Sequence, residues 1–500
     1  MTSYSNTVSR FRPVEIGNID GKRVVVEAVP EAMTAFGGVS MLQMIEEKVG
    51  LVGGLCNRIN DKRNPKYIEH QPTDIVMQRV CQTAIGFAGG SDSDWLHNDP
   101  GILMGLGRNP ESTSTGASQP TISRFESQAI NKDNWNSVTS IFIDHYISQH
   151  KRKGEKKKHS ITIDADGVKY VTYGSQQGSV YRGGDKYGCQ MYFPLQFWSG
   201  DCLLGTILRR GYESEAPTIL PELKKLVNKL REHWPRIRIK VRMDSAFASP
   251  DLMKWLKNQR IKYELGLKNT SVIKLYSKAF VEEAERMFKE EFGEPRFLDK
   301  NGKFGKKEKE KFNEEHQRIR DLPAKERMQQ EHEWNSRRVR VVGEFCYKPD
   351  SWKSFLEQEE WERVICRVDY TDKGVDVRCI ISSQQHGVPQ RIYEDEYATR
   401  GAAEQCIGVG KQVSHRLSAQ EFNSNQFRLI LNGISHMLLM HLRKYVAGSH
   451  RRADVNTMRK KVLLMPMAVR QTEKKIVLRI SENHPHCKEF LATWRRLSTA

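Results

Sequence analysis

Three carboxylates, far apart in the chain, have the local settings expected of ligands for divalent cations. Asp164 lies at the end of the predicted strand HSITIDADG, and Asp244 lies at the end of another, RIRIKVRMDSAF. Glu404 lies in the predicted helix YATRGAAEQCIGVGK. Mg²⁺ prefers oxygen ligands and keeps several waters, so a few carboxylates suffice to hold it. Crowded carboxylates repel one another unless a cation lies among them, which makes bound metal the natural partner of such a cluster.

Metal ions held in this way would support chemistry on a phosphodiester. Two ions about 3.5–4 Å apart stabilise both the attacking and the leaving oxygen of an in-line displacement. We expect Asp164 to bridge two Mg²⁺ ions, for which Mn²⁺ would substitute, while Asp244 and Glu404 each complete one side. Asp166 is a second candidate for the role of Asp164. If the strand continues through it, however, we expect its side chain to point away from the residue beside Asp164.

The segment around Glu404 carries further groups suited to DNA. Three other residues share with it the spacing Y-x2-R-x3-E-x6-K, namely Tyr397, Arg400 and Lys411. At about 100° per residue all four fall on one narrow helical face, and their polarity excludes a core stripe. Arg400 suits bidentate contact with phosphate and Lys411 a point-charge contact, while Tyr397 would bond a phosphate or pack. The alternative is a surface ladder of ion pairs, since Arg400 and Glu404 are four residues apart.

The order of the surrounding elements predicts how the aspartates meet. We expect three strands, a helix, a strand, a helix and a strand, over 159–167, 188–198, 202–209, 217–234, 236–247, 250–260 and 261–268. The first three strands would form an antiparallel meander, and the later ones would return through helical crossovers. This is the order of the ribonuclease H-like α/β fold, in which the first and fourth strands are neighbours. Asp164 and Asp244 would then lie side by side at one end of the sheet.

Five regions are predicted from composition and periodicity. They are a mainly helical DNA-binding region, the first part of the ribonuclease H-like core, a charged and β-rich insertion, the last part of the core with Glu404, and a C-terminal region: 1–150, 151–269, 270–390, 391–446 and 447–500. In the first region Arg124 lies on a helix predicted to begin near Ser118, either a DNA-contacting helix or an ordinary surface helix. In the insertion, 280–338 is either a solvated helix pair or partly disordered.

The bulk composition narrows the class of protein. A chain of 500 residues with a net charge of +19 favours a polyanionic partner, with nucleic acid the first choice. The nine cysteines, with no Cys-x-x-Cys, predict reduced and mostly buried thiols. The N-terminus has no apolar leader, and the longest apolar helix candidate, 427–442, is too short to span a bilayer. We therefore expect a cytoplasmic protein.

Several longer stretches carry a family likeness. They are AFGGVSMLQMIEEKVGL, SDSDWLHNDPGILMGLGR, SQPTISRFE, ITIDADG, YGSQQGSVYRGGDKYGCQMYFPL, LLGTILRRGYESE, VRMDSAFASPDL and EFNSNQFRLILNGISHMLLMHLR. In these stretches the chain resembles the insertion-sequence 1380 family of bacterial transposases. The tetrad at 397–411 resembles the YREK signature of the DDE transposase superfamily whose members carry a β-rich insertion before the glutamate. The resemblance covers nearly the whole chain, except much of 270–345.

The resemblance implies a function and a set of partners. It implies a DNA transposase in which Asp164, Asp244 and Glu404 serve metal-dependent excision of a mobile element and strand transfer into target DNA. The partners implied are terminal inverted repeats of double-stranded DNA and a second copy of the chain in a synapse. The cellular setting implied is the bacterial cytoplasm, on the nucleoid when bound to DNA. Two alternatives remain: a ribonuclease H-like nuclease or resolvase without strand transfer, and a non-catalytic DNA-binding relative.

The resemblance also bears on the tryptophans of the insertion. In related transposases an aromatic residue of this insertion stacks on a base flipped out near the cut, which is worth about 1–3 kcal/mol per base. Trp334, Trp352 and Trp361 are the candidates, and Trp334 is included among the expected DNA-binding residues. We expect at least two of the three to pack the small core of the insertion instead, and the sequence does not choose between them.

Overall fold

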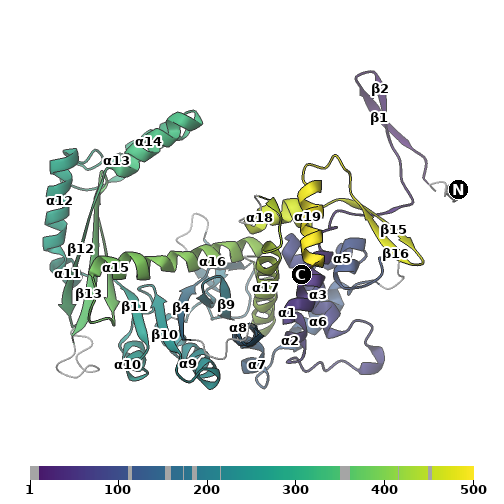
Figure 1. Cartoon of the computed structure of the whole chain (residues 1–500), viewed down its shortest axis with the longest axis horizontal. Coiled ribbons are helices and arrows are strands. Elements are labelled where there is room, and N and C mark those ends of the chain that lie inside the picture. Colours follow the sequence, from purple (N-terminus) through teal and green to yellow (C-terminus); the bar gives the residue numbers. More distant parts are fainter. Residues whose placement is uncertain are drawn as a thin grey trace.

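The protein is built on one large mixed sheet, with a bundle of helices at one end and a helical arm at the other (Figure 1). The computed structural model describes residues 11–110, 115–152, 159–172, 174–182, 188–213, 215–348, 361–414, 416–448 and 453–499. The strands of the sheet lie in the order β12, β13, β14, β11, β10, β4, β8, β9. Their bounds are β4 (Ser160–Gly167), β8 (Leu195–Ser199), β9 (Cys202–Ile207), β10 (Arg238–Met243), β11 (Lys262–Leu267), β12 (Arg338–Tyr347), β13 (Glu362–Thr371) and β14 (Gly374–Ser382).

The centre of the sheet has the strand order that the sequence predicts. β4 pairs in parallel with β10, which pairs in parallel with β11, and β8 and β9 follow β4 as antiparallel neighbours. The chain returns to β10 through α9 (Glu215–His233) and to β11 through α10 (Pro250–Asn258). The pairing of β4 with β10 confirms the prediction that the first and fourth strands of the core are neighbours.

The two faces of this sheet differ because its strands alternate apolar and charged residues. Ile163 of β4 and Val241 of β10 are buried in a core that α9 and α10 complete. Lys240 and Arg242 therefore face the other way, since successive side chains of a strand point to opposite faces. A helical run from α15 (Pro389–Arg391) to α16 (Gly401–Val413) lies along this second, charged face (Figure 1).

One predicted strand is two strands in the structure. The expected strand over 188–198 divides into β7 (Cys189–Tyr192) and β8, with Pro194 between them. Proline has no N–H to give to a ladder, so a strand is interrupted where it occurs. β7 instead pairs with β5 (Tyr170–Thr172) and β6 (Val180–Arg182) in a small sheet of its own.

The charged insertion is helical first and then extends the main sheet. Residues 280–338 include α12 (Lys278–Phe292), α13 (Lys306–Arg320) and α14 (Ala324–Ser336), preceded by α11 (Ser271–Tyr276). Of the two sequence-based alternatives for this stretch, the structure has the solvated helices, and α13 and α14 form the projecting arm (Figure 1). The insertion contains the three expected strands but more helix than strand, and β12, β13 and β14 do not form a sheet of their own, because β14 pairs antiparallel with β11.

The helical bundle packs around one long buried helix, α17 (Phe422–Arg443). Helices α1, α3 and α6 contact it directly, and nearly all of its described side chains are buried. The N-terminal helices have the bounds α1 (Ser40–Val49), α2 (Leu51–Cys56), η1 (Pro65–Tyr67), α3 (Pro72–Ile85), α4 (Ser93–Leu96), α5 (Pro100–Gly105), α6 (Gln119–Ala129), α7 (Trp135–Thr139) and α8 (Ile141–Arg152). Among the described residues, none of the helices has the length and apolar character needed to cross a bilayer.

Segments near the two ends of the chain pair with each other beside this bundle. β3 (Ala32–Thr34) pairs with β15 (Met467–Thr472), which pairs with β16 (Lys475–Arg479). Before them, β1 (Val14–Ile19) and β2 (Lys22–Val26) form an exposed hairpin that projects from the body (Figure 1). The remaining elements are α18 (Val455–Met458), η6 (Arg459–Leu463) and α19 (Cys487–Ser498). All nine cysteines have free thiols, as predicted.

Candidate active site

The register of β4 and β10 decides which carboxylates meet. Asp164 lies opposite Arg242, and Ala165 lies opposite Met243. Continued by one residue, the same register sets Asp244, directly after β10, beside Asp166. Asp164 and Asp166 are two positions apart on one strand and so share a face of the sheet. The expectation that Asp166 points away from the site is therefore wrong, because alternation turns only the intervening residue, Ala165, into the core.

Asp164 is engaged by an arginine of the neighbouring strand. Its two carboxylate oxygens accept from Nε and Nη2 of Arg242 at 2.6 and 2.7 Å, and the residue is only 3% exposed. Burial raises the pKa of the Asp164 carboxyl, and the ion pair with Arg242 opposes that rise. Nη1 of the same Arg242 donates to the carbonyl of Glu396 and the hydroxyl of Thr399. Through Arg242 of β10, Asp164 of β4 is thus linked to the turn before the helix of Glu404.

Asp166 is the aspartate that the structure brings toward Asp244 and Glu404. Arg400 donates from Nη1 to Oδ2 of Asp166 at 3.2 Å and from Nη2 to Oε1 of Glu404 at 2.5 Å. Burial raises the pKa of Asp166 to about 6, with Asp244 and Glu404 adding to the rise and Arg400 opposing it. Three carboxylates from three distant segments therefore share one electrostatic environment, with the guanidinium of Arg400 between two of them.

Tyr397 and a glycine complete the wall around Asp244. The guanidinium carbon of Arg400 lies 5.8 Å from the centre of the Tyr397 ring. A β-carbon on Gly266 of β11 would come within 2.7 Å of the Ser245 nitrogen and 3.0 Å of the Tyr397 hydroxyl. Oδ1 of Asp244 accepts from the backbone N–H of Ala246 at 2.9 Å. The close approach of β11, the turn after β10 and Tyr397 therefore requires glycine at 266.

The predicted signature helix is real but irregular at its start. Tyr397 ends a π-helical turn, η3 (Ile392–Tyr397), Arg400 ends a 3₁₀ turn, η4 (Ala398–Arg400), and regular α-helix begins only with α16. Arg400 still contacts both Tyr397 and Glu404, as a common face requires. Lys411 lies in the last turn of α16, half-buried and nearly two turns beyond Glu404.

The fold and this geometry give a basis for comparison with known proteins. The family described as "Transposase DDE domain group 1" matches residues 16–500, almost the whole chain. The chain belongs to this family. No curated protein matches this transposase. Among solved structures it is similar to "piggyBac transposase synaptic complex with hairpin DNA", at 9% identity and a TM-score of 0.36, over 87% of this chain and 83% of that one.

A second ion network, which sequence reasoning missed, lies beside the first. Lys240 contacts both Glu264 and Glu396, and Gln384 donates to the same two carboxylates at 2.9 and 2.8 Å. Glu396 is thus tied to β10, to β11 and to the segment after β14. The alternation of basic with apolar residues in RIRIKVRMD was the available signal, since it sets Lys240 and Arg242 on the face along which the helix of Glu404 lies.

The carboxylates of Asp166, Asp244 and Glu404 are ligands that suit a divalent cation. Their arrangement in this structure does not, because Arg400 lies between two of them. Among the described residues, no three His, Cys, Asp or Glu side chains stand ready to hold a metal ion. The cation between Asp166 and Glu404 is the guanidinium of Arg400. Burial raises the pKa of Asp166, and the nearby carboxylates of Asp244 and Glu404 raise it further. A metal ion would relieve that crowding with oxygen ligands of the kind it prefers.

The remaining DNA-binding candidates lie outside this cluster. Trp334 packs in the insertion, with ring centroids 5.3 Å from Phe312 and 5.5 Å from Phe297 and with Arg296 over its face at 4.8 Å. Its position corresponds to the packing alternative. Trp361 is 54% exposed.

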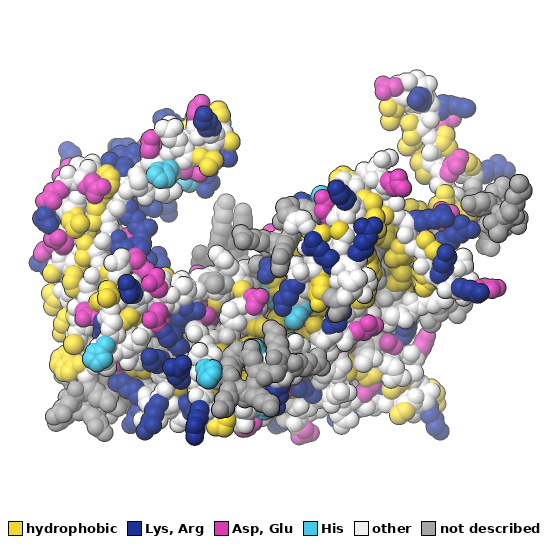
Figure 2. Space-filling view, viewed as in Figure 1, with side chains coloured by type: hydrophobic (Ala, Val, Ile, Leu, Met, Phe, Trp, Pro, Cys, Tyr) yellow, Lys and Arg dark blue, Asp and Glu magenta, His cyan; other side chains and the backbone are white. Residues whose placement is uncertain are grey.

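Trp352 lies outside the described residues. Arg124 is exposed on α6 and donates from Nε to the carbonyl of Pro120. Lys and Arg side chains are spread over the visible face of the molecule, on the arm as well as on the body (Figure 2).

Proposed function

We propose that this transposase cuts DNA at the ends of a mobile element and joins those ends to target DNA, with Asp166, Asp244 and Glu404 as its metal-holding carboxylates. The observation that carries the proposal is the meeting of Asp166 with Glu404 on the guanidinium of Arg400, at the edge where β10 delivers Asp244. The strand order β9-β8-β4-β10-β11 supports a ribonuclease H-like core. Asp164, our first sequence-based candidate, is instead a positioning residue in this proposal.

Each side chain of the cluster has a role that its contacts support. Two Mg²⁺ ions held by the three carboxylates would stabilise the attacking and leaving oxygens of the phosphodiester. With cations bound to the carboxylates, Arg400 would be free of Asp166 and Glu404, and its guanidinium would be available to the phosphate of the scissile strand. Lys411, further along α16, contacts a neighbouring phosphate as a point charge. Tyr397 packs against Arg400 and sets its direction.

The same site serves both steps of the reaction. In the first step water attacks the phosphodiester at the element's end and leaves a 3′-hydroxyl. In the second step that hydroxyl attacks a phosphodiester of the target DNA, so only the nucleophile changes. We propose double-stranded DNA with terminal inverted repeats as the substrate and a homodimer as the unit that holds two ends in the synapse. The net charge of +19 is consistent with such a partner.

Paired variants test the choice between the two aspartates of β4. Asp166→Asn should lower cleavage of an element-end duplex by more than about a hundredfold, because it removes a ligand of the metal. Asp164→Asn, the matched control, should lower it by only about 10–100-fold, as for groups that support a ligand indirectly. Added Mg²⁺ should raise the unfolding temperature of wild type and Asp164→Asn but not that of Asp166→Asn. The opposite ranking would return the catalytic role to Asp164.

A strand-transfer assay separates transposition from simple nuclease action. Pre-cut element ends with free 3′-hydroxyls are mixed with target plasmid, wild-type protein and Mg²⁺. Joined product is the expected result, and Asp244→Asn is the control that should give none. Nicking without joining would instead favour the ribonuclease H-like nuclease or resolvase. Equal phenotypes of wild type and Asp244→Asn in an excision assay would favour a non-catalytic DNA-binding protein.

A further inference from the structure

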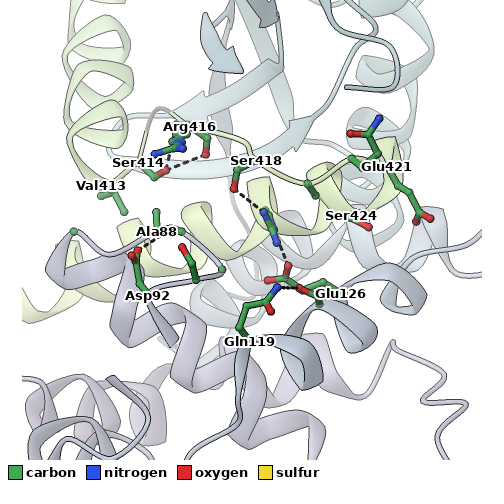
Figure 3. A pocket seen from close by; sticks show the side chains of 18 of the residues that line it. Ala88, Asp92, Gln119, Glu126, Val413, Ser414, Arg416, Ser418, Glu421 and Ser424 are labelled. Carbon is green, nitrogen blue, oxygen red and sulfur yellow. Dashed lines mark hydrogen bonds and ion pairs between the residues drawn. The ribbon is translucent and has the colours of Figure 1, made fainter. Parts of the chain in front are cut away.

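A polar pocket of about 790 Å³ lies where the far end of the Glu404 helix meets the N-terminal bundle (Figure 3). Its walls come from the loop 86–92, from α6, and from 412–428, which joins α16 to α17. Gln412, which follows Lys411 directly, is one of the lining residues. The volume is within the range of about 300–1,000 Å³ that is usual for ligand sites.

The lining is rich in groups that bond phosphate and sugar oxygens. Serine and glutamine side chains predominate, and two of them on α6, Gln119 and Ser123, bond each other at 2.9 Å. Hydroxyl and amide side chains, backbone N–H groups and helix N-termini supply much of the contact between proteins and the DNA backbone. Both α6 and α17 begin at this pocket, with Gln119 and with Glu421 before Phe422.

The charges that line the pocket cancel, and a buried arginine behind them leaves a small positive excess. Of its acids, Glu126 already accepts from Arg79 at 3.1 Å and from Arg428 at 2.6 Å, and Asp92 accepts from the N–H of Gly89 at 2.8 Å. The charged residues that line it are Arg416, Arg428, Arg459, Asp92, Glu126 and Glu421. These balance one another, and Arg79, buried behind Glu126, adds one further positive charge.

The pocket lies at a distance from the cluster that a DNA strand can span. Eight residues of helix separate Glu404 from Gln412, a rise of about 12 Å at about 1.5 Å per residue. A stacked strand of DNA advances about 3.4 Å per nucleotide. The pocket is therefore about three to four nucleotides from a phosphodiester held at Glu404, with Lys411 between the two.

We propose that this pocket binds the backbone of the DNA strand that runs from the active site, at phosphates about three to four nucleotides from the scissile one. The inference rests on the proposed function and adds a second anchoring point for the same strand. Phosphate oxygens accept from the serine and glutamine side chains of α6 and of 412–424. Arg428, fixed by Glu126 and by the hydroxyl of Ser418 at 2.8 Å, supplies a preset positive charge.

Filling the pocket tests this inference. The probe is a fluorescein-labelled duplex carrying the inverted repeat that flanks the gene, with one phosphodiester at a time replaced by a neutral methylphosphonate. Binding is measured by anisotropy without divalent metal. Wild type should lose about tenfold in affinity when the replaced phosphate is three or four nucleotides from the cut. Ser123→Phe should bind the unmodified duplex about tenfold more weakly and lose nothing further at those positions.

Controls keep failure of the pocket distinct from failure of the proposed function. Gln128 lies on the same helix outside the pocket. Gln128→Phe should therefore lose affinity at the same replaced phosphates as wild type. Ser127→Phe, at the more exposed rim, replaces Ser123→Phe if the latter does not fold. The filled variant should also show a slope of log affinity against log salt that is shallower by about 1. A filled variant that scans like wild type would overturn the inference while leaving the proposed function intact. A wild type that neither binds nor cuts the duplex would overturn the proposed function.

Discussion

Arg400 sets the electrostatic state of the candidate site in the absence of metal. Its guanidinium bonds Asp166 and Glu404 and packs on the ring of Tyr397, with only 14% of the side chain exposed. The pKa of Arg400 is raised above its usual range, despite the opposing effect of burial, by Tyr397 and by the surrounding carboxylates. An arginine does not give up its charge here, so Asp166 and Glu404 would become available to a metal ion only if the Arg400 guanidinium moved away from them.

The raised pKa of Asp166 predicts a stability difference that depends on pH. A carboxyl with a pKa of about 6 when folded, against 3.8 for its ordinary value, binds a proton more tightly in the folded than in the unfolded protein. Its contribution to the free energy of unfolding is therefore lost as pH rises from about 4 to about 6. Relative to Asp166→Asn, metal-free wild type should lose at most about 3 kcal/mol over that range.

Chemical denaturation of both proteins at pH 4, 5, 6 and 7 with EDTA measures this difference. Other titrating groups are common to the two proteins and cancel in the comparison. A difference that stays constant across the range, or that grows with pH in favour of wild type, would mean that burial and the neighbouring carboxylates do not raise the pKa of Asp166. The role proposed for it would then lose its electrostatic support.

Gly266 predicts the effect of one added carbon beside Asp244. A β-carbon at this position would lie 2.7 Å from the Ser245 nitrogen and 3.0 Å from the carbonyl carbon of Asp244, both backbone atoms that cannot rotate away. Gly266→Ala should cost about 1–3 kcal/mol of stability and lower cleavage by displacing Asp244. Gly205→Ala in β9 is the control, since its β-carbon would meet Phe197 at an ordinary 3.5 Å. Equal behaviour of the two variants in unfolding and cleavage would contradict the prediction.

For single residues, the sequence could identify the residue types of the site but not which residue each of them contacts. Three carboxylates and an arginine could be picked out because their chemistry and spacing are local properties. The choice between Asp164 and Asp166 depended on the register of β4 against β10 and on Arg242. A shift of register by two residues leaves the alternation of a strand unchanged, because that alternation repeats every two residues, so the pattern cannot choose between Asp164 and Asp166.

Among the elements, the turn before α16 depends on β10 for its position. Arg242 reaches from β10 to Asp164 of β4, to the carbonyl of Glu396 in η3 and to the hydroxyl of Thr399 in η4. The irregular turns η3 and η4 lack the repeating hydrogen bonds of an α-helix, so their direction relies on such contacts. Arg242 therefore sets where Arg400 and Glu404 point.

We predict that Arg242→Lys keeps the positive charge beside Asp164 but misaligns Glu404. Lysine keeps the positive charge beside Asp164 but lacks the planar fork needed to bond three groups at once. We expect cleavage to fall about 10–100-fold, with the Mg²⁺ concentration for half-maximal rate rising, because Glu404 is no longer held in place. Arg238→Lys, exposed on the same face of β10, is the matched control and should behave like wild type. A fall in rate with no change in the Mg²⁺ dependence would contradict a role in positioning Glu404.

The elements themselves divide into those that periodicity specifies and those that it does not. The apolar stripe over 217–234 identified α9 to within two residues at each end, and the alternation over 236–247 identified β10 but overran its observed end by four residues. The π-helical turn at η3 carries no period of its own, and it lies where buried Tyr393 and Ile392 pack on Ile365 and Ile380 of distant strands. Contacts so remote in sequence decide the local geometry there, which local patterns cannot reveal.

The whole molecule joins a sheet that holds the chemistry to a bundle that has a different core. The buried residues of the sheet's inner face form one cluster, and those of the bundle, with α17 at its centre, form another. Helix α17 contacts both β9 and the N-terminal helices, so it connects the two. That the N-terminal and C-terminal segments share the sheet β3-β15-β16 could not be predicted, because nothing short of the fold brings 32–34 near 467–472.

A buried ion triad within the bundle predicts the largest effect of a single substitution on stability. Glu126 of α6 accepts from Arg79 of α3 and Arg428 of α17, with 1%, 2% and 10% of the side chains exposed. Glu126→Gln would leave two buried guanidinium groups without their carboxylate, at a cost of about 3–5 kcal/mol. Glu421→Gln, exposed at the rim of the same pocket, should change stability by less than about 0.5 kcal/mol. Denaturation midpoints measure both, and a loss below about 1 kcal/mol for Glu126→Gln would mean that the triad does not hold α3, α6 and α17 together.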